Sequence, residues 1–354
     1  MSSRLEELIR ILPKTELHLH LEGSVTPELL SELAREQGSE LAGLSVEELD
    51  RRVYAFEDFY SFLDSYRIIC THLIRPEDYL RVFREVEAYL ERDNIRYAEL
   101  IYTPSIPWKF GRDGEEILDA LVAEAERLGR EGGSQVRWIL DSVRQFGVEA
   151  AEKTAELARK YVDRGVVAVG LGGDEASVPA AEFASVFGWA RAHGLFVHIH
   201  AGEIGPPKEI WQALQVLGAN RIGHGVQAAR DPVLMEYLRE HAVGLDVCLT
   251  SNVRTRAWPM LPQHPLPLLL KRGVPVSLAT DDPGLFKTGL CREIQKAVET
   301  FDLGEEDLSR ILLQGVRSSF LPHDPKMRLM QEFGDEIRDT LRGTGTGTVS
   351  EDRP

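Results

Sequence analysis

The sequence predicts an α/β protein with the (β/α)8 TIM-barrel fold and a helical insertion after the first strand. Eight short runs of β-branched or other apolar residues recur along the 354 residues, and most are followed by a turn and a segment with helical periodicity. Short polar motifs lie at the carboxyl ends of these runs, where barrel enzymes place their chemistry. A doubly wound open sheet is the alternative that this alternation leaves open.

The predicted strands are short runs bounded by turn residues. They are Glu16 to His20, Ile95 to Ile101, Val136 to Asp141, Val166 to Leu171, Leu195 to His200, Arg221 to His224, Val243 to Cys248 and Val274 to Thr280. The helical pattern is clearest in four segments that follow strands. These segments are Val148 to Arg164, Ala180 to His193, Pro207 to Leu217 and Pro232 to His241.

The connection between the first two strands, Leu21 to Asn94, is unusually long. It contains an amphipathic stretch, Phe56 to Ile69, whose aromatic residues suit either a lid over the active site or an ordinary packing helix. We predict a single barrel domain over residues 1–342. Residues 343–354 have almost no apolar content, so we predict that this tail is disordered.

The composition excludes several classes of partner. A formal net charge of -16 without a run of Lys and Arg argues against nucleic acid and anionic membranes. No stretch of about eighteen apolar residues could span a bilayer, and the first residues do not resemble a secretory signal. Cys70, Cys248 and Cys291 lie far apart, so we expect neither disulfides nor a cysteine-ligated zinc. These features predict a cytoplasmic protein.

Histidines and a carboxylate at strand ends predict a metal site. Because residues two apart in a strand point the same way, His18 and His20 share one side of the first strand, while Leu17, Leu19 and Leu21 face the helices. His200 ends the fifth strand and Asp281 ends the eighth, which neighbours the first in a closed barrel. Three imidazoles and one carboxylate suit a single zinc that keeps a position for water. His198 is expected to be a deeper packing residue or a partner of the ligands.

Further polar residues beside the predicted ligands suit acid–base chemistry. Glu203 follows His200 in a Gly-containing turn, from which its carboxyl can exchange protons if burial raises its pKa. His224 is bracketed by glycines and can serve as a base or an orienting group for water. Asp282 points away from Asp281 along the strand and is the better candidate for contacting a substrate. The backbone N–H of Gly173 is a further candidate for contacting a planar ligand.

These motifs together resemble the adenosine deaminase family of the amidohydrolase superfamily. The resemblance spans most of the chain and implies a mononuclear zinc (β/α)8 barrel that replaces a purine 6-amino group by oxygen. The motifs that carry it are Pro13 to Ser24, Gly172 to Glu175, His200 to Glu203, Arg221 to Gly225, Val247 to Asn252 and Ser277 to Pro283.

Transferred motif by motif, the resemblance implies a role for each site residue. The zinc ligands would be His18, His20, His200 and Asp281. Glu203 would protonate purine N1, and His224 would serve the attacking water, with Asp281 as a third catalytic residue. Asp282 would contact N7 and the Gly173 N–H would contact N3, while His20 and Glu22 complete the residues facing the substrate. The class of deaminase whose zinc site contains Pro-Cys-x-x-Cys is excluded, because that motif is absent.

The substrate is less well defined than the reaction. Glu22 stands where nucleoside deaminases of the family often have Asp, and Leu249 stands where Pro is common. We expect a small purine nucleoside, with adenosine favoured. Aminodeoxyfutalosine is the close alternative, whose aromatic 5′ extension could lie against the insertion and whose carboxylate would need Arg67 or Arg144. Adenine is less favoured. A binuclear hydrolase lacks support because the fourth strand has no lysine, and a non-catalytic metal-binding relative should have lost a ligand or Glu203.

Overall fold

The strands form one parallel sheet that closes into a barrel. The computed structural model describes residues 3–343, and its strands follow the order β1 to β8 with every neighbouring pair parallel. A bridge between Leu19 and Asp281 joins the last strand segment to the first. The (β/α)8 prediction is therefore confirmed and the open sheet is excluded. The strands are β1 Lys14–His20, β2 Ile95–Tyr102, β3 Gln135–Val143, β4 Val166–Gly172, β5 Phe196–Ala201, β6 Arg221–His224, β7 Gly244–Val247 and β8 Val276–Leu278.

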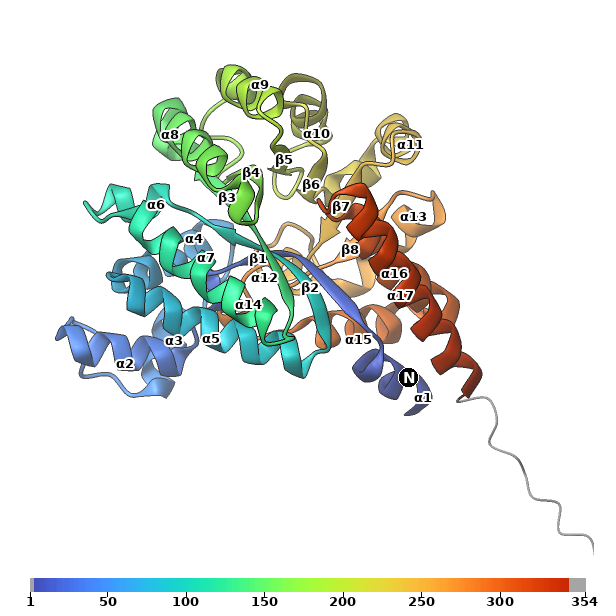
Figure 1. Ribbon diagram of the computed structural model, residues 1–354, viewed down its shortest axis with the longest axis horizontal. Coiled ribbons are helices and arrows are strands. Elements are labelled where there is room, and N and C mark those ends of the chain that lie inside the picture. Colours follow the sequence, from blue (N-terminus) through green and yellow to red (C-terminus); the bar gives the residue numbers. More distant parts are fainter. Residues whose placement is uncertain (1–2, 344–354) are drawn as a thin grey trace, which may run out of the picture.

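Helices surround the strands, and most of them connect one strand to the next (Figure 1). Those before β4 are α1 Ser3–Ile11, α2 Pro27–Gln37, α3 Val46–Val53, α4 Phe59–His72, α5 Pro76–Arg92, α6 Ser105–Lys109, α7 Gly114–Arg130 and α8 Gly147–Lys160. Those after β4 are α9 Ala184–Ala192, α10 Pro207–Gln212, α11 Pro232–Glu240, α12 Leu249–Arg254, α13 Leu266–Lys271, α14 Pro283–Phe286, α15 Leu290–Phe301, α16 Glu305–Ser318 and α17 His323–Gly343.

The four predicted helical segments are all present. Three of them contain a change of helix type that the periodicity did not indicate. A 3-10 turn, Val162–Arg164, follows α8, another, Ala180–Phe183, precedes α9, and α10 continues as a π-helical turn, Ala213–Leu217. Gly343, assigned to the predicted tail, is the last residue of α17. The remainder of that tail, residues 344–354, lies outside the described residues.

The long insertion folds into α2 to α5, and its aromatic residues do both of the jobs foreseen for them. In α4, Phe62 is buried and its ring stacks on that of Phe286, with 5.2 Å between the ring centroids. The same side chain lines the cavity that contains His20, His200 and Asp281, together with Phe59 and Tyr66. The helix α4 therefore packs against the barrel and also forms part of the wall of the cavity.

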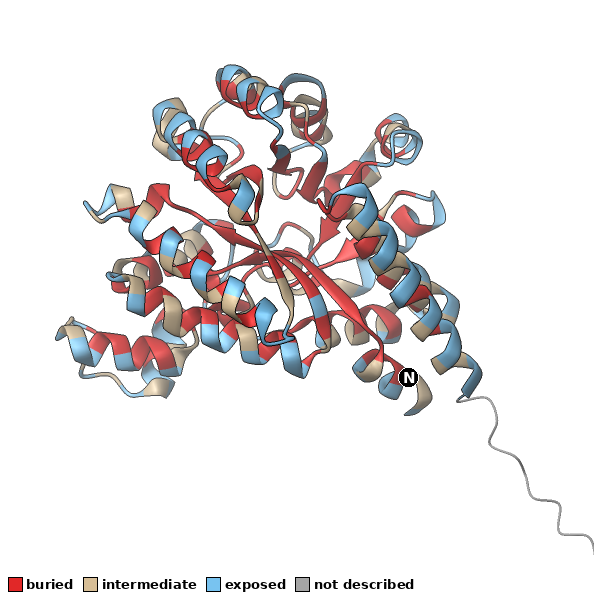
Figure 2. Cartoon of the chain, viewed as in Figure 1, coloured by how far each residue is buried: buried red, intermediate tan, exposed pale blue. Residues whose placement is uncertain are grey.

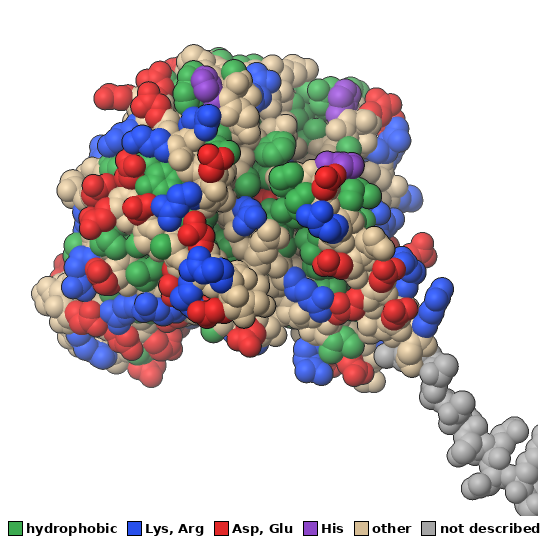
Figure 3. Space-filling view, in the orientation of Figure 1, with side chains coloured by type: hydrophobic (Ala, Val, Ile, Leu, Met, Phe, Trp, Pro, Cys, Tyr) green, Lys and Arg blue, Asp and Glu red, His purple; other side chains and the backbone are tan. Residues whose placement is uncertain are grey.

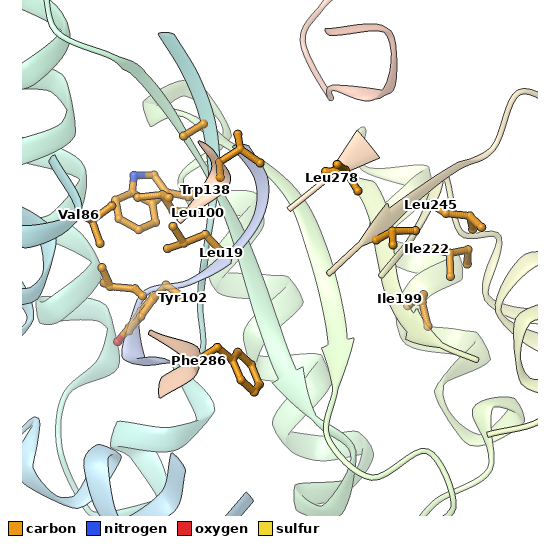
Figure 4. Packing of buried hydrophobic residues seen from close by; sticks show 14 of the residues in the cluster. Leu19, Val86, Leu100, Tyr102, Trp138, Ile199, Ile222, Leu245, Leu278 and Phe286 are labelled. Carbon is orange, nitrogen blue, oxygen red and sulfur yellow. The ribbon is translucent and has the colours of Figure 1, made fainter. Parts of the chain in front are cut away.

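The apolar core lies between the strands and the surrounding helices. Figure 2 shows that the strands are almost wholly buried, whereas the helices are buried on the side facing the barrel and exposed on the other. On one side of the barrel Leu19, Leu100 and Trp138 pack towards Val86 of α5 (Figure 4). Burial of apolar surface stabilises a fold by about 25 cal/mol per Å2. The apolar contacts between the strands and the helices are therefore the main source of stability.

Strand β1 departs from simple alternation. Its pairing with β2 shifts register between Lys14 and Thr15 and again between Glu16 and Leu19. As a result, Leu17 packs against Tyr97 and Leu321 and does not join the cluster that contains Leu19. Leu17, Leu19 and Leu21 were all expected to face the helices, and Leu17 has Leu329 of α17 beside it, in a cluster separate from that of the other two.

Buried charges join several strands inside the barrel. The guanidinium of Arg221 on β6 donates to Asp246 of β7 and to Glu99 of β2, each at 2.6 Å, and to the carbonyl oxygen of Leu17 at 2.9 Å. Asp246 also accepts from His198 Nε2 at 3.0 Å. Arg221, Glu99 and Asp246 are all fully buried. Such pairing is required because an unpaired charge in the interior is very costly.

The surface charge is mixed (Figure 3), and the three cysteines are unpaired. Among residues 3–343, no helix is both long and apolar enough to cross a membrane. On the face shown in Figure 3, basic side chains are interspersed with acidic ones. Cys70, Cys248 and Cys291 are free thiols, as expected.

Removing the central cation should destabilise the barrel strongly. Arg221→Met leaves Glu99 and Asp246 as buried carboxylates without their partner, and we expect the free energy of unfolding to fall by about 3–5 kcal/mol. Chemical denaturation of both proteins measures the difference. Arg96→Met is the control, since Arg96 is 44% exposed and pairs with Glu336 at the surface, where the change should stay within about 1 kcal/mol. Equal losses in the two variants would contradict the role assigned to Arg221.

Candidate metal centre and active site

Four side chains from three strand ends converge at one point. His18 and His20 come from β1, His200 comes from β5, and Asp281 follows β8. His20 Nε2 lies 3.3 Å from His18 Nε2 and 3.1 Å from His200 Nε2. Asp281 Oδ1 lies 3.2 Å from His18 Nε2 and 3.4 Å from His20 Nε2. All four residues are buried.

This cluster fits a tetrahedral metal ion. Ligands bound to zinc at about 2.0–2.1 Å lie roughly 3.3 Å from one another, which matches the distances within the cluster. Burial lowers the pKa of His18 and of His20 well below the ordinary value, so both rings are neutral and offer a lone pair. The nearby group His18, His198 and Asp246 is a poorer candidate, because the Asp246 carboxylate already accepts from Arg221, His198 and Ser277.

Two residues at this point have strained backbone conformations. Asp281 has φ 64° and His224 has φ 60°, the left-handed region that non-glycine residues rarely adopt. The backbone of Asp281 is held there by β1, since its N–H donates to the His18 carbonyl at 2.9 Å and its carbonyl accepts from the His20 N–H at 2.8 Å. Strain of about 1–3 kcal/mol per residue persists where the surroundings impose it, and it is common at functional sites.

The turn that carries Glu203 is held by another carboxylate. Glu175, in the loop after β4, accepts hydrogen bonds from the backbone N–H groups of residues 202, 203, 204 and 205 at 2.6, 2.9, 3.0 and 3.2 Å. A Cβ on Gly205 would lie 2.8 Å from Glu175 Oε2, so glycine is needed for this approach. Glu175 thus fixes the backbone from which the Glu203 side chain reaches the cavity.

The Glu203 carboxyl lies beside His224 at the bottom of the cavity. Glu203 Oε2 is 3.7 Å from His224 Nε2, and Glu203 Oε1 accepts from the Thr255 hydroxyl at 3.4 Å. Burial, reinforced by the carboxylates of Asp281 and Glu175, raises the pKa of Glu203 well above its ordinary value. A carboxyl that keeps its proton near neutral pH is suited to act as a general acid.

Two of the predicted substrate-facing groups line the same cavity. Asp282 is buried, and its Oδ1 atom has no hydrogen-bond partner among the described residues. A Cβ on residue 23 would lie 1.7 Å from this atom, so Gly23 is what leaves room for the carboxylate. Gly173 has φ 88° and lines the cavity beside the Gln145 side chain.

Glu22 is placed differently from a free acceptor for a sugar hydroxyl. It is fully buried; its Oε1 atom accepts from the Thr103 N–H at 2.9 Å and its Oε2 atom from the Tyr66 hydroxyl of α4 at 3.3 Å. Glu22 is absent from the residues lining the cavity, whereas Thr103 and Tyr66 line it. The Glu22 carboxyl group therefore fixes Thr103 and Tyr66 in the cavity wall and does not itself line the cavity.

The cavity has a volume of about 400 Å3, with a polar bottom and an apolar mouth. At the bottom lie His20, His200, His224, Glu203, Asp281 and Asp282. The aromatic side chains of the wall are Phe59, Phe62, Tyr66, Phe110 and Phe146. A cavity of this size and composition can enclose a nucleoside-sized ligand.

Two cations lie in the wall of the cavity, and only one of them, Arg67, was expected there. Arg67 of α4 and Lys109 of α6 line it. The Arg67 side chain is 67% exposed, and its ion pair with the exposed Asp64 is long, at 3.7 Å, so the guanidinium can also pair with an anion in the cavity. Arg144 is fully buried and donates to the carbonyl groups of Val178 and His200, both at 3.3 Å. Arg144 is therefore unavailable for the substrate carboxylate that sequence reasoning allowed it to bind.

Several site residues were not foreseen. Asp141, at the end of β3, lines the cavity, is buried and has an Oδ1 atom without a partner among the described residues. Its position at a strand end was a signal that could have found it. Glu175 lay within the motif Gly172 to Glu175, but its contact with the Glu203 turn depends on the path of a loop, and Lys109 gave no signal for the same reason.

The chain belongs to the adenosine deaminase family. The model of that family, described as "Adenosine deaminase", matches residues 13–336. With its eight-stranded barrel and buried His and Asp cluster, the protein has both the fold and the candidate metal site expected from the sequence motifs.

Relatives within the family are named for different purine substrates. The aminodeoxyfutalosine deaminase of Streptomyces coelicolor is 38% identical over 331 residues, which cover 93% of this chain and 85% of that protein. The adenosine deaminase of Klebsiella pneumoniae is 35% identical and covers 90% and 97% of the two chains. The crystal structure of an adenine deaminase from Arthrobacter aurescens superposes with a TM-score of 0.86 at 29% identity, over 92% of this chain and 99% of that one.

A methyl group placed behind the cluster should weaken metal binding. A Cβ on Gly223 would lie 2.8 Å from His18 Cε1, so Gly223→Ala must displace a ligand ring. We expect the affinity for a divalent ion to fall about 10-fold or more, as measured by competition with a chromogenic chelator. Gly188→Ala is the control, because a Cβ there meets no atom within 4 Å. Unchanged affinity in the Gly223 variant would argue against His18 as a ligand.

Proposed function

We propose that the protein is a zinc-dependent hydrolytic deaminase that releases the 6-amino group of a purine nucleoside as ammonia. We further propose that the preferred nucleoside has an aromatic 5′ extension with a carboxylate, as aminodeoxyfutalosine does. The observation that carries the first part is the buried cluster of three imidazoles and one carboxylate beside Glu203. We also propose that residues 1–342 work as one domain.

The zinc would be held by His18, His20, His200 and Asp281, one ion per chain. When bound, zinc acts as a Lewis acid that makes hydroxide available near neutral pH. The chain contributes neutral imidazoles and a buried carboxylate, which it supplies without any cysteine. The β4 strand carries no lysine that could bridge a second ion, which supports a single ion.

Glu203 would donate a proton to purine N1. Its buried carboxyl holds that proton because ionisation is disfavoured in its environment. Protonation of N1 draws electron density from C6 and makes that carbon open to attack. Glu175 keeps the donor in place through the four backbone hydrogen bonds of the Glu203 turn, so the carboxyl need not be reoriented during the reaction.

Other groups would orient the purine. Asp282 Oδ1 lacks a partner in the cavity wall and would face N7, and the Gly173 N–H would face N3. His20 would lie close to the substrate as well as to the metal. His224 Nε2 lies 3.7 Å from Glu203 and 3.9 Å from Asp281, where it can orient the attacking water.

The mouth of the cavity supports a substrate with an anionic aromatic extension. Its wall combines aromatic rings with Arg67 and Lys109, and a benzoate-like group could pack on the former and pair with the latter. The 38% identity to an aminodeoxyfutalosine deaminase agrees with this reading. Glu22, by contrast, is already engaged by Thr103 and Tyr66, which weakens the argument for a bare 5′-hydroxyl.

Adenosine is the second candidate. Each carboxylate oxygen of Glu22 accepts one protein hydrogen bond, and a carboxylate has further lone pairs. A small shift of Tyr66 would turn one of them towards a 5′-hydroxyl. Adenine is a weaker candidate, because the aromatic mouth would then have no ligand to contact.

Replacing the proposed acid should abolish turnover without losing the metal. Glu203→Gln keeps the volume of the side chain but cannot deliver a proton, so we expect kcat to fall about 10²- to 10⁴-fold. Metal analysis should find one equivalent of zinc in both the wild type and the variant. Glu182→Gln, at an exposed position, should change neither quantity. A Glu203 variant of nearly normal rate would remove this residue from the mechanism, and two equivalents or none would overturn the single zinc.

A substrate panel decides the specificity. We expect kcat/KM to be at least tenfold higher for aminodeoxyfutalosine than for adenosine, 2′-deoxyadenosine or adenine in an ammonia-release assay.

Arg67→Ala and Lys109→Ala should each lower kcat/KM about tenfold for the carboxylate substrate and less than twofold for adenosine. Arg130→Ala, exposed on α7, is the control. Equal losses on both substrates would refute carboxylate binding, and no ammonia from any substrate would refute the deaminase.

A further inference from the structure

The imidazole of His224 can carry its proton on either ring nitrogen, and the choice decides what the residue can do. A neutral imidazole has one N–H, and the hydrogen bond made at His224 Nδ1 decides which nitrogen carries it. Its Nε2 atom faces Glu203 and Asp281. With the proton on Nε2 the ring is a hydrogen-bond donor towards these groups, and without it the ring is a base.

A chain of hydrogen bonds leads to His224 from the backbone N–H of Leu266, a group that can only donate. The backbone N–H of Leu266, the first residue of α13, lies 3.2 Å from His264 Nδ1. His264 Nδ1 must therefore accept. The His264 ring is neutral, since burial lowers its pKa to about 3. A neutral imidazole has one N–H, so the proton of His264 is on Nε2.

This proton fixes the orientation of the next side chain. His264 Nε2 lies 3.2 Å from Asn252 Oδ1, which accepts from it. The Asn252 amide group then turns its Nδ2 atom towards His224 Nδ1, at a distance of 3.1 Å. Because Nδ2 can only donate, His224 Nδ1 accepts, and the proton of His224 is on Nε2.

If the Asn252 amide were turned the other way, two hydrogen-bond donors would face each other. With Asn252 flipped, its NH2 group would face His264 Nε2, which would have to accept. The proton of His264 would then be on Nδ1 and would meet the Leu266 N–H. His264 and Asn252 are buried, at 3% and 0% exposure, and an unsatisfied buried donor costs about 1–3 kcal/mol. The orientation described above is therefore strongly preferred.

We infer that His264 and Asn252 are positioning residues that fix His224 in its Nε2–H form. The deduction of the tautomer stands on the hydrogen bonds alone, and its catalytic consequence rests on the proposed deaminase function. In this form His224 orients water and stabilises negative charge as a donor, and it is not a base in the resting enzyme. Of the two roles that the sequence allowed for His224, this arrangement selects the orienting one.

One isosteric substitution should reverse the tautomer. Asn252→Asp keeps the shape of the side chain but presents an oxygen to His224, whose Nδ1 must then carry the proton while Nε2 loses it. The analogous loss of the correct tautomer in serine proteases costs about 10⁴-fold. We expect kcat on the best substrate to fall at least 10²-fold in the zinc-loaded variant, with zinc content unchanged.

The direct readout is the protonation of the ring nitrogens by 15N NMR of the zinc-loaded protein, with signals assigned by comparison with His224→Asn. We expect Nε2–H for His224 in the wild type and Nδ1–H in Asn252→Asp. A wild-type His224 protonated on Nδ1, or a tautomer that stays the same in the variant, would overturn the inference. Because this measurement needs no substrate, it remains decisive even if the protein proves not to be a deaminase.

Variants at His264 provide a second test if Asn252→Asp fails to fold. His264→Gln can accept from Leu266 through its carbonyl and donate to Asn252 through its amide, so it should retain the Nε2–H form of His224 and at least a third of the wild-type kcat. His264→Leu cannot orient the amide and should lose about 10-fold or more. Equal activity in the two variants would show that His264 does not act through Asn252.

Discussion

The hydrogen bonds that close the barrel are made by the residues that form the candidate metal centre. His20 donates its N–H to the Asp281 carbonyl, and Asp281 donates its N–H to the His18 carbonyl. These bonds bring the first strand to the end of the last, and the side chains of the same residues lie within 3.2 to 3.4 Å of one another. The junction between β1 and the residues after β8 is therefore built from the same residues as the ligand cluster. The geometry of the junction and that of the cluster depend on each other.

Several charged side chains lie inside this barrel, and each is held by hydrogen bonds to others. Arg221 ties Glu99 and Asp246 together in the lower part of the barrel, and Asp246 in turn holds His198, whose ring centroid lies 5.0 Å from that of His18. At the upper end Glu175 holds the Glu203 turn. Buried polar groups must be satisfied almost completely to be tolerated. The consequence is a set of side chains with few alternative positions, which suits groups that must meet a substrate in one orientation.

The sequence predicted the fold and the ligand cluster because both depend on regular strands. Two histidines separated by one residue share a side of a strand, and strand ends gather at one end of a barrel. Irregular backbone limited the rest. Strand β1 shifts register between Glu16 and Leu19, and Leu17 packs in a different cluster from Leu19, which alternation alone could not foresee. The path of a loop decided that Glu175 meets the Glu203 turn and that His264 meets Asn252. Arg144 had the charge expected of a carboxylate-binding residue but was buried against carbonyl groups.

The spacing of the ligands along the chain has a consequence for biosynthesis. Two of them lie in the first strand, and the last, Asp281, follows the eighth. Since a ribosome adds about 5–20 residues per second, β1 must wait many seconds before its partner strand emerges. During that time β1 lacks its bridge to Asp281, and His18 and His20 lack the carboxylate that completes their cluster. The complete ligand set can form only near the end of translation, after Asp281 has been added. A truncated chain that lacks β8 and Asp281 could form neither the closed barrel nor the complete ligand set.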